Sequence, residues 1–392
     1  MRLLISVGIL LFIVVGIFLC WRYRKVKLSG DTPSSSAVLV AILFTSGLDS
    51  GFILMPLVEF PSYQSDPSYG FVNPLAIELG FWGLTAWFLY FVSTLYFLTL
   101  EPKLQLFKRP SIRLVNSLVV LMTCAFTLSL FLQLIPQYTD YFLTEISELV
   151  LFALLFFMII FALLVSTKVR FMTRLSQVSV LLFCALILVI GITNDFSSQD
   201  LVTSLAATRG YLANFHQFIL PFNDYHEFYL AWWLTWTILL GQFVAKFVNQ
   251  MSPFKLLLTM VLIPLIPTAI WFSVLYHHFI IQAVMSPVIA ITMVLLALLF
   301  VVNSLDFMVA HYSQSLSIDR KRLGMKKFVL FNSILLLMLT AMFKEQWLFI
   351  QWTALLVILI ALLGLLEFLT TTRLKQLHLH INNFVKVGVD KR

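Results

Sequence analysis

The chain has 392 residues, of which 60% are hydrophobic and 11% are charged, with a mean hydropathy of +0.97. A soluble domain of this size could not bury so many apolar side chains, so the composition excludes a soluble globular protein. The net charge of +8 would suggest nucleic-acid binding in a soluble protein. Here the charge lies between apolar runs, and we predict an all-α polytopic membrane protein with no nucleic-acid partner.

The apolar runs predict about 11 transmembrane helices, since about 20 residues span a bilayer. In chain order they cover residues 3–20, 37–60, 74–99, 113–135, 148–166, 175–193, 224–247, 256–276, 282–310, 328–343 and 347–370. The first run has its basic residues at its trailing end, the reverse of a cleavable signal, so we expect it to be retained.

The basic residues predict the orientation of these helices. Of the 26 Lys and Arg, all but Arg2, Arg209 and Lys344 fall in alternate loops and in the carboxyl-terminal tail. By the positive-inside rule, the amino terminus is expected outside and the carboxyl terminus in the cytoplasm, as suits a multi-pass protein of the cytoplasmic membrane.

Two predicted spans are chemically unusual. The second contains FTSGLDSGFILMP, in which Gly47, Gly51 and Pro56 weaken a helix and Asp49 places a carboxyl at membrane depth. The seventh contains LAWWLTW, with three tryptophans in five positions, although membrane tryptophans usually lie at the water interface.

The unusual spans divide the chain into two groups of five, spans 2 to 6 and spans 7 to 11. An odd number of spans makes the groups run in opposite directions, which predicts a LeuT-like five-plus-five inverted repeat with one extra amino-terminal helix. The predicted division is 1–30 for the extra helix and basic loop, 36–193 and 224–370 for the repeats, 194–223 for an extracellular segment, and 371–392 for a cytoplasmic tail.

The seventh span, FYLAWWLTWTILLGQFVAKF, resembles the signature helix of the betaine/choline/carnitine transporter (BCCT) family, W-x-W-W-x-x-W-x-P-F-x-G-x-F-I-A-R. FTSGLDSG followed by Glu59, GFWGLTAWFLY, RGYLANF, PLIPTAIWFSV and FVVNSLD resemble further family segments in the same order. The resemblance covers about residues 15 to 370 and identifies a divergent member that lacks the family's first span.

The resemblance implies a box of aromatic rings for a quaternary ammonium solute, held by cation-π attraction at about 0.5 to 2 kcal/mol per ring. Six residues match the positions of the box and of the nearby aromatic wall: Trp82, Trp87, Tyr90, Trp232, Trp233 and Trp236. At 100° per residue, each set of three projects from one side of its helix. The alternative is that these rings are ordinary packing or lipid-facing aromatics.

Asp49 replaces the middle glycine of the family's G-M-G-x-G motif. An intramembrane carboxyl is costly unless it is paired, so it is a functional candidate as a counter-ion for a cationic solute or as a proton carrier. A purely structural role is the alternative.

A candidate ion site follows from the same resemblance. In sodium-coupled members, a Thr-Ser pair and backbone carbonyls of the glycine-rich helix hold the ion, and the corresponding residues here are Gly47, Leu48, Gly51, Asn303 and Ser304. Asn303 stands in place of the threonine, and its amide oxygen leaves sodium coupling open. Na⁺ and H⁺ are therefore both candidate coupling ions.

We expect a secondary active transporter of glycine betaine, choline or carnitine. The alternative is a non-transporting BCCT-like sensor or accessory protein, since Ile238 and Lys246 also depart from the family pattern. The sequence contains no catalytic constellation, phosphate-binding loop or metal-ligand set, so we predict no enzyme activity and no cofactor. Expected partners are the solute and membrane lipid, with a homo-trimer implied by the resemblance.

Overall fold

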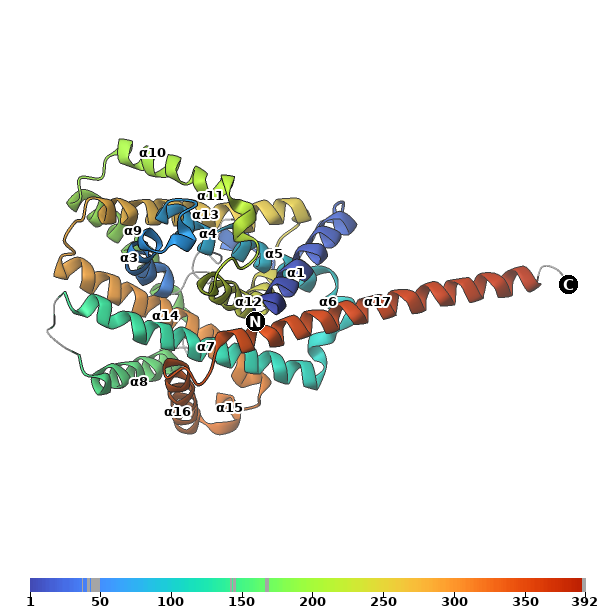
Figure 1. The fold of residues 1–392 in the computed structure, drawn as a ribbon. Coiled ribbons are helices and arrows are strands. Elements are labelled where there is room, and N and C mark those ends of the chain that lie inside the picture. Colours follow the sequence, from blue (N-terminus) through green and yellow to red (C-terminus); the bar gives the residue numbers. More distant parts are fainter. Residues whose placement is uncertain are drawn as a thin grey trace.

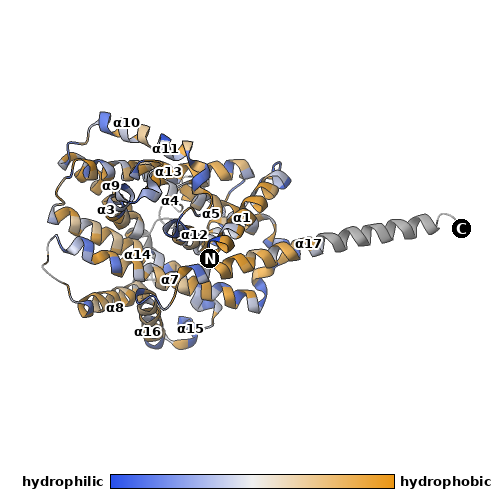
Figure 2. Ribbon diagram, viewed as in Figure 1, coloured by the Kyte–Doolittle hydropathy of each residue, from blue (hydrophilic) through white to orange (hydrophobic). Residues whose placement is uncertain are grey.

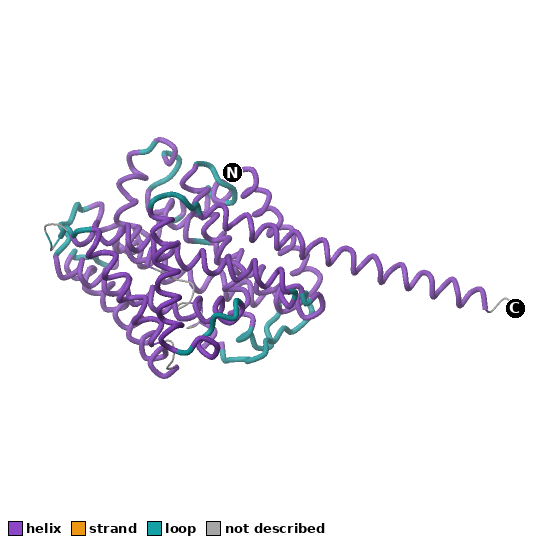
Figure 3. Tube along the Cα trace, turned by 90° about the horizontal axis from the view of Figure 1, so that it is seen from below, coloured by secondary structure: helices purple, strands orange, loops and turns teal. Residues whose placement is uncertain are grey.

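The computed structural model describes residues 1–389 except 37, 41, 42, 44–49, 142, 144, 145 and 166–168. This part of the chain is helical, and it contains one isolated bridge between Leu28 and Met251 and no strand (Figures 1 and 3). The long helices are α1 (Arg2–Tyr23), α3 (Ser50–Ser65), α5 (Leu84–Thr99), α7 (Pro110–Thr139), α8 (Glu148–Val165), α9 (Val169–Thr193), α12 (Asp224–Ala245), α13 (Pro253–Ile280), α14 (Pro287–Ser315), α16 (Met325–Lys344) and α17 (Ile350–Val389). The short ones are η1 (Pro67–Tyr69), α4 (Pro74–Trp82), α6 (Glu101–Leu104), η2 (Leu106–Lys108), α10 (Ser198–Ala207), α11 (Arg209–Ala213), η3 (Phe215–Phe218) and α15 (Arg320–Leu323).

The chain is an all-α polytopic membrane protein. Among the described residues, 8 helices are long and apolar enough to cross a membrane, or 9 if the bent pair 177–193 and 198–213 forms one span. The predicted span at 148–166 is a shorter apolar helix, and most of the first half of 37–60 lies outside the described residues. Apolar residues cover most of the long helices (Figure 2).

Serine-proline pairs set the start of two of these spans. Ser252 and Ser286 each cap a helix by accepting a backbone N–H with the side-chain oxygen, at Lys255 and Ile289, and proline follows in the first turn. Proline there loses no hydrogen bond, because the first turn of a helix has free N–H groups. The sequence therefore starts both helices locally, before any packing.

The helices pack in matching pairs across the two predicted groups. α7 packs on α14, α5 on α13 and α8 on α16, so that each of these helices meets its own counterpart five spans away. Contacts of α14 with α8, α9 and α3 are mirrored by contacts of α7 with α16, α17 and α12, and the contact of α5 with α12 is mirrored by that of α13 with α3. This reciprocity is the packing expected of two similar halves related by a twofold axis.

The extra helix α1 is fastened to α12 at both ends. Arg2 forms an ion pair with Asp224 at the start of α12, with 2.7 Å between nitrogen and oxygen. At the other end, the segment after α1 bonds with the segment after α12 through backbone atoms, for example Gly30 N to Val248 O at 2.9 Å. A Cβ at Gly30 would overlap the backbone oxygen of Ala245, so glycine permits this approach. The two helices therefore run in the same direction, as spans 1 and 7 must.

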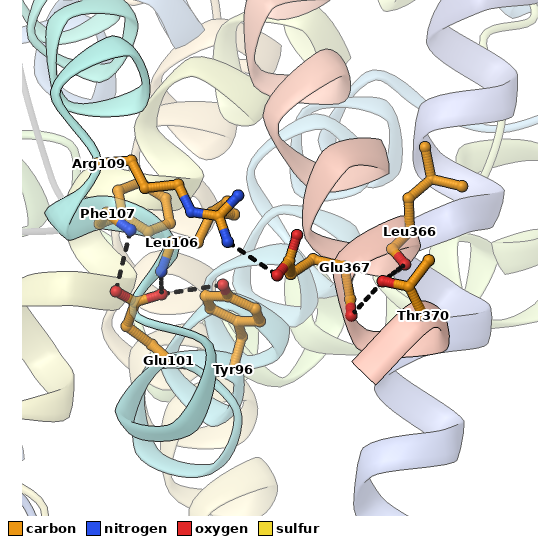
Figure 4. Close-up of polar contacts among 8 residues, drawn as sticks. All are labelled: Tyr96, Glu101, Leu106, Phe107, Arg109, Leu366, Glu367 and Thr370. Atoms are coloured by element: carbon orange, nitrogen blue, oxygen red, sulfur yellow. Dashed lines mark hydrogen bonds and ion pairs between the residues drawn. The ribbon is translucent and has the colours of Figure 1, made fainter. Parts of the chain in front are cut away.

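The basic end of the bundle is closed by a polar cluster (Figure 4). Glu101 accepts hydrogen bonds from the backbone N–H groups of Leu106 and Phe107 at 3.1 and 3.0 Å and from the Tyr96 hydroxyl at 3.0 Å. Beside it, Arg109 donates to Glu367 of α17 at 2.8 Å. These contacts tie the loop between α5 and α7 to the last helix.

Candidate functional site

α12 lies at the centre of the molecule and is unbroken. From Tyr229 to Gly241 every residue of α12 is buried, so the helix has no lipid-facing side over this stretch. Ile238 stands where the family pattern has proline, and the single Gly241 does not interrupt the helix. Gly241 instead permits contact, because a Cβ there would overlap the Ser93 hydroxyl of α5.

The break falls in the third predicted span. Gly83 has φ −91° and ψ −133°, which separates α4 from α5. Helical spacing predicted Trp82, Trp87 and Tyr90 on one side of a continuous helix, and this prediction is wrong for Trp82 because the chain turns at Gly83. The Tyr211 hydroxyl accepts the freed Leu84 N–H at 2.8 Å, so the break is stabilised by a side chain.

Three of the six predicted aromatic residues form one cluster. Trp232 stacks on Trp233 with ring centroids 4.6 Å apart and planes at 14°, and Trp82 meets both edge-on at 5.5 and 4.8 Å. We call these three rings the tryptophan cluster. Face-to-face stacking covers one face of each of two rings, and all three side chains are at most 4% exposed, so the cluster is shielded from the surroundings in the described conformation.

The other three aromatic residues are buried nearby. Trp87 and Tyr90 of α5 pair with each other, with centroids 5.5 Å apart, and Trp236 lies one turn beyond Trp232 and Trp233 on α12. All three side chains are buried. The structure thus brings three of the six predicted rings, from α4 and α12, into direct contact and places the others on α5 and α12, which pack against each other.

The indole N–H groups are mostly without partners. Trp233 donates to the backbone oxygen of Phe81 at 2.7 Å. In contrast, the indole nitrogens of Trp82, Trp232 and Trp236 are buried and have no hydrogen-bond partner in the described part of the chain. Buried donors are normally satisfied, so the N–H groups of Trp232 and Trp236 point to a ligand or water that carries acceptor oxygens, whereas the N–H of Trp82 lies beside the carboxyl of Glu78.

A buried carboxyl, that of Glu59, lies directly beside the tryptophan cluster. Its oxygens accept hydrogen bonds from the hydroxyls of Tyr63, Tyr225 and Tyr229, the last at 2.8 and 2.9 Å. The Tyr229 ring in turn lies 5.8 Å from that of Trp232 and 6.1 Å from that of Trp82. Tyr229 therefore connects the carboxyl to the rings.

A second buried carboxyl, that of Glu78 on α4, faces the first. The polar side chains beside it are those of Glu59, Tyr63 and Trp82. Glu78 is fully buried, and neither of its oxygens accepts a hydrogen bond from a donor in the described residues. We call Glu59 and Glu78 the carboxyl pair.

Neither Glu59 nor Glu78 was predicted from the sequence to be a site residue. Glu59 was named only as part of the resemblance, and Glu78 was not singled out. The signal was present, because an acidic residue in a predicted span (ELGFW, residues 78–82) is a functional candidate on physical grounds alone.

The predicted ion-binding residues are only partly within the described chain. Gly47, Leu48 and the solute candidate Asp49 lie outside it, whereas Gly51 is buried on α3. Asn303 of α14 donates to Ser179 at 3.2 Å, and its amide oxygen, like the Ser304 hydroxyl, is buried without a partner in the described residues. α14 packs on α3. Neutral oxygens of this kind are among the ligands that hard cations such as Na⁺ bind. The described residues contain no cluster of His, Cys, Asp or Glu that could hold a metal ion.

Comparisons with known proteins add little to this geometry. No family model and no curated protein matches the chain. Among solved structures, one described as the substrate-bound outward-open state of a Na⁺-coupled sialic acid symporter is similar, with a TM-score of 0.46 and 14% identity over 92% of this chain and 83% of that one. A TM-score at this level is too low to assign a fold or a function.

Proposed function

We propose that the chain is a secondary active transporter of small quaternary ammonium solutes of the glycine betaine, choline and carnitine class. The observation that carries this proposal is the tryptophan cluster, which lies buried at the centre of a polytopic membrane protein with unpartnered indole donors. A trimethylammonium group offers no hydrogen-bond donor, so ring faces are the natural site for it.

The unpartnered donors extend the proposal to the rest of the solute. Trp232 and Trp236 each present a buried N–H without an acceptor in the described residues. A carboxylate or hydroxyl oxygen on the solute would satisfy them, and a charged acceptor gains about 1.5 to 3 kcal/mol per hydrogen bond. This chemistry favours a zwitterion such as glycine betaine or carnitine over choline, which has only a hydroxyl.

Alternating access would follow from the paired packing of the two groups of helices. The closed tryptophan cluster is then an occluded state, and movement of α3, α5, α12 and α13 against α7, α8, α14 and α16 would open it. Asn303 and Ser304 supply neutral oxygens for a coupling cation. A resemblance in residues and a matching of helix pairs support this mechanism.

The test is uptake of radiolabelled glycine betaine, carnitine and choline into cells that lack their own carriers, with a sodium gradient, a proton gradient, or neither. We expect saturable uptake that Trp232→Leu abolishes. Trp352→Leu, a change at an exposed tryptophan of α17, is the matched control and should leave uptake intact. Absence of uptake under every gradient, from protein correctly inserted in the membrane, would overturn the transporter proposal.

A second function is favoured by the residues that depart from the family pattern. Asn303 stands where the family has a coupling threonine, Ile238 stands where it has a proline, and Lys246 stands where it has an arginine. A non-transporting sensor would keep the binding site without coupling. Binding of glycine betaine to the purified protein, measured by tryptophan fluorescence, together with absent uptake would favour this alternative.

A further inference from the structure

The carboxyl pair has an arrangement that ordinary packing does not explain. Glu59 is 5% exposed and Glu78 is 0% exposed, and the two carboxyls face each other from α3 and α4. None of the ion pairs in the described part of the chain involves either residue. Two adjacent carboxylates in a low-dielectric site without a cation repel strongly, so at most one of them is ionised.

The hydrogen-bond donors are shared unequally between the two carboxyls. Glu59 accepts from three tyrosine hydroxyls, whereas neither oxygen of Glu78 has a donor in the described residues. Hydrogen bonds from neutral donors stabilise the ionised form of the carboxyl that accepts them. The negative charge therefore belongs on Glu59, and a proton on Glu78 would let it donate to Glu59 and satisfy both groups.

Tyrosines dominate the surroundings of the pair on every packed element. The titratable and charged groups that face it are Tyr63 on α3, Tyr69 with Asp66 at η1, Tyr138 on α7, and Tyr225 and Tyr229 on α12. His226 lies behind Phe81, stacked on its ring at 4.9 Å. Lysine and arginine are absent from this set, so no fixed positive charge replaces the proton.

The carboxyl pair adjoins the tryptophan cluster through Trp82. The indole N–H of Trp82 lies beside Glu78 and is buried without a partner in the described residues. Trp82 also belongs to the tryptophan cluster, where its ring meets Trp232 and Trp233. A change that separates Trp82 from these rings to admit a solute alters the contacts of the side chain that adjoins Glu78.

The pair is also linked to one end of the bundle. Tyr225 is 38% exposed at the start of α12, and its hydroxyl bonds to Glu59. Asp224 next to it pairs with Arg2, so this is the end of the bundle at which the amino terminus lies. The tyrosine hydroxyls are the groups through which a proton would pass between this end of the bundle and the carboxyl pair.

We propose that Glu59 and Glu78 bind one exchangeable proton between them, and that solute in the tryptophan cluster controls its uptake and release through Trp82 and Tyr229. In the described conformation the proton stays on Glu78 and the pair carries a charge of minus one. The proton passes from a Glu78 oxygen to water, and the charge changes to minus two, only in a conformation in which water reaches the pair. The proton-binding part stands on the geometry alone. The coupling to solute rests on the proposed function.

The proton is tested by infrared spectroscopy of the purified protein at neutral pH. A buried protonated carboxyl gives a carbonyl-stretching band that shifts in deuterium oxide, and we expect Glu78→Gln to remove it. Glu227→Gln is the matched control, because Glu227 is a buried glutamate near the start of α12 that makes no hydrogen bond with either member of the pair in the described residues, and it should leave the band intact. Absence of the band from the unmutated protein overturns the proposal whether or not the variants fold.

The coupling is tested by uptake in parallel. We expect a proton gradient, outside acidic, to stimulate uptake, and Glu78→Gln to lose this stimulation while uptake down a solute gradient remains. Uptake that is driven by sodium and indifferent to the proton gradient would overturn the coupling and leave the transporter proposal standing. If the infrared band is present but no solute is taken up under any gradient, the transporter proposal is overturned and the proposed proton site stands.

Discussion

The protein has glutamates away from bulk water in two regions, and the hydrogen-bond donors around them differ. At the basic end, Glu101 is half-buried, accepts two backbone N–H groups and a tyrosine hydroxyl, and has Arg109 nearby (Figure 4). At the centre, Glu59 accepts only tyrosine hydroxyls and faces a second carboxyl. Backbone donors belong to a fixed loop, whereas hydroxyls rotate and exchange protons, so the first arrangement holds a loop and the second can pass a proton.

The central arrangement depends on the close approach of α5 and α12, and breaking that approach should have the largest effect. In Gly241→Ala the new Cβ would overlap the Ser93 side chain and lie 2.8 Å from its backbone carbonyl carbon. We expect the free energy of unfolding in detergent to fall by about 1 to 3 kcal/mol, with loss of uptake. Gly191→Ala, where a Cβ meets nothing closer than 3.9 Å, is the control. It should be neutral or stabilising, and an equal loss in both variants would contradict the packing argument.

The tyrosine donors can be removed one at a time. Tyr229→Phe takes one hydroxyl from Glu59 and keeps the ring. A hydrogen bond to a charged group contributes about 1.5 to 3 kcal/mol, so we expect a loss of unfolding free energy near 2 kcal/mol. Tyr276→Phe is matched, because the Tyr276 hydroxyl makes no hydrogen bond within the described chain and its ring packs on Phe60. If both changes cost the same, Tyr229 acts through ring packing alone.

The peripheral carboxylate should respond to loss of its acceptor atoms. Glu101→Ala leaves the N–H groups of Leu106 and Phe107 without an acceptor, and we expect a cost of about 1 to 2 kcal/mol in thermal or denaturant unfolding. Uptake at saturating solute should be unchanged, in contrast to the central variants. A transport defect larger than the stability defect would remove the distinction between the two regions.

The smallest effect is a pH dependence of stability at Glu101. Burial raises the pKa of this carboxyl above its ordinary value of 4.5, and the bonds from Phe107, Tyr96 and Leu106 offset part of that rise. The folded state then binds more protons than the unfolded state, so stability falls as pH rises through the window that opens at 4.5. Glu101→Gln should flatten this slope between pH values on either side of the window. An unchanged slope would assign it to another group.

Much of the fold could be predicted from the sequence, because long apolar runs indicate membrane-spanning helices and basic loops indicate their orientation, and both can be recognised without knowledge of the packing. The apolar runs at 224–247, 256–276 and 282–310 predicted α12, α13 and α14, although α13 and α14 begin at Pro253 and Pro287, after the Ser252 and Ser286 caps. The break at Gly83 was not predicted, since a single glycine is tolerated in many helices and only the Tyr211 hydroxyl from a distant segment shows why the turn opens here.

The candidate site was predictable only in part. Helical spacing placed the tryptophans together on α12, but it could not show that Trp232 stacks on Trp233 rather than lining an open space. The carboxyl pair escaped prediction because its two members lie 19 positions apart on different helices, and their contact depends on the packing of α3 against α4. The role of Asp49 stays a prediction.

The two fastenings of α1 bear on how α12 can move. The Arg2–Asp224 ion pair joins the first ends of α1 and α12, and the backbone bonds at residues 28–34 join their last ends, so α1 is attached to α12 at both ends. A helix that is attached at both ends to a second helix resists bending and unwinding, and we expect the two to tilt together as one rigid unit. Opening of the tryptophan cluster would then swing α1 through the surrounding lipid, and the thickness and stiffness of the bilayer would act as a mechanical load on the central site.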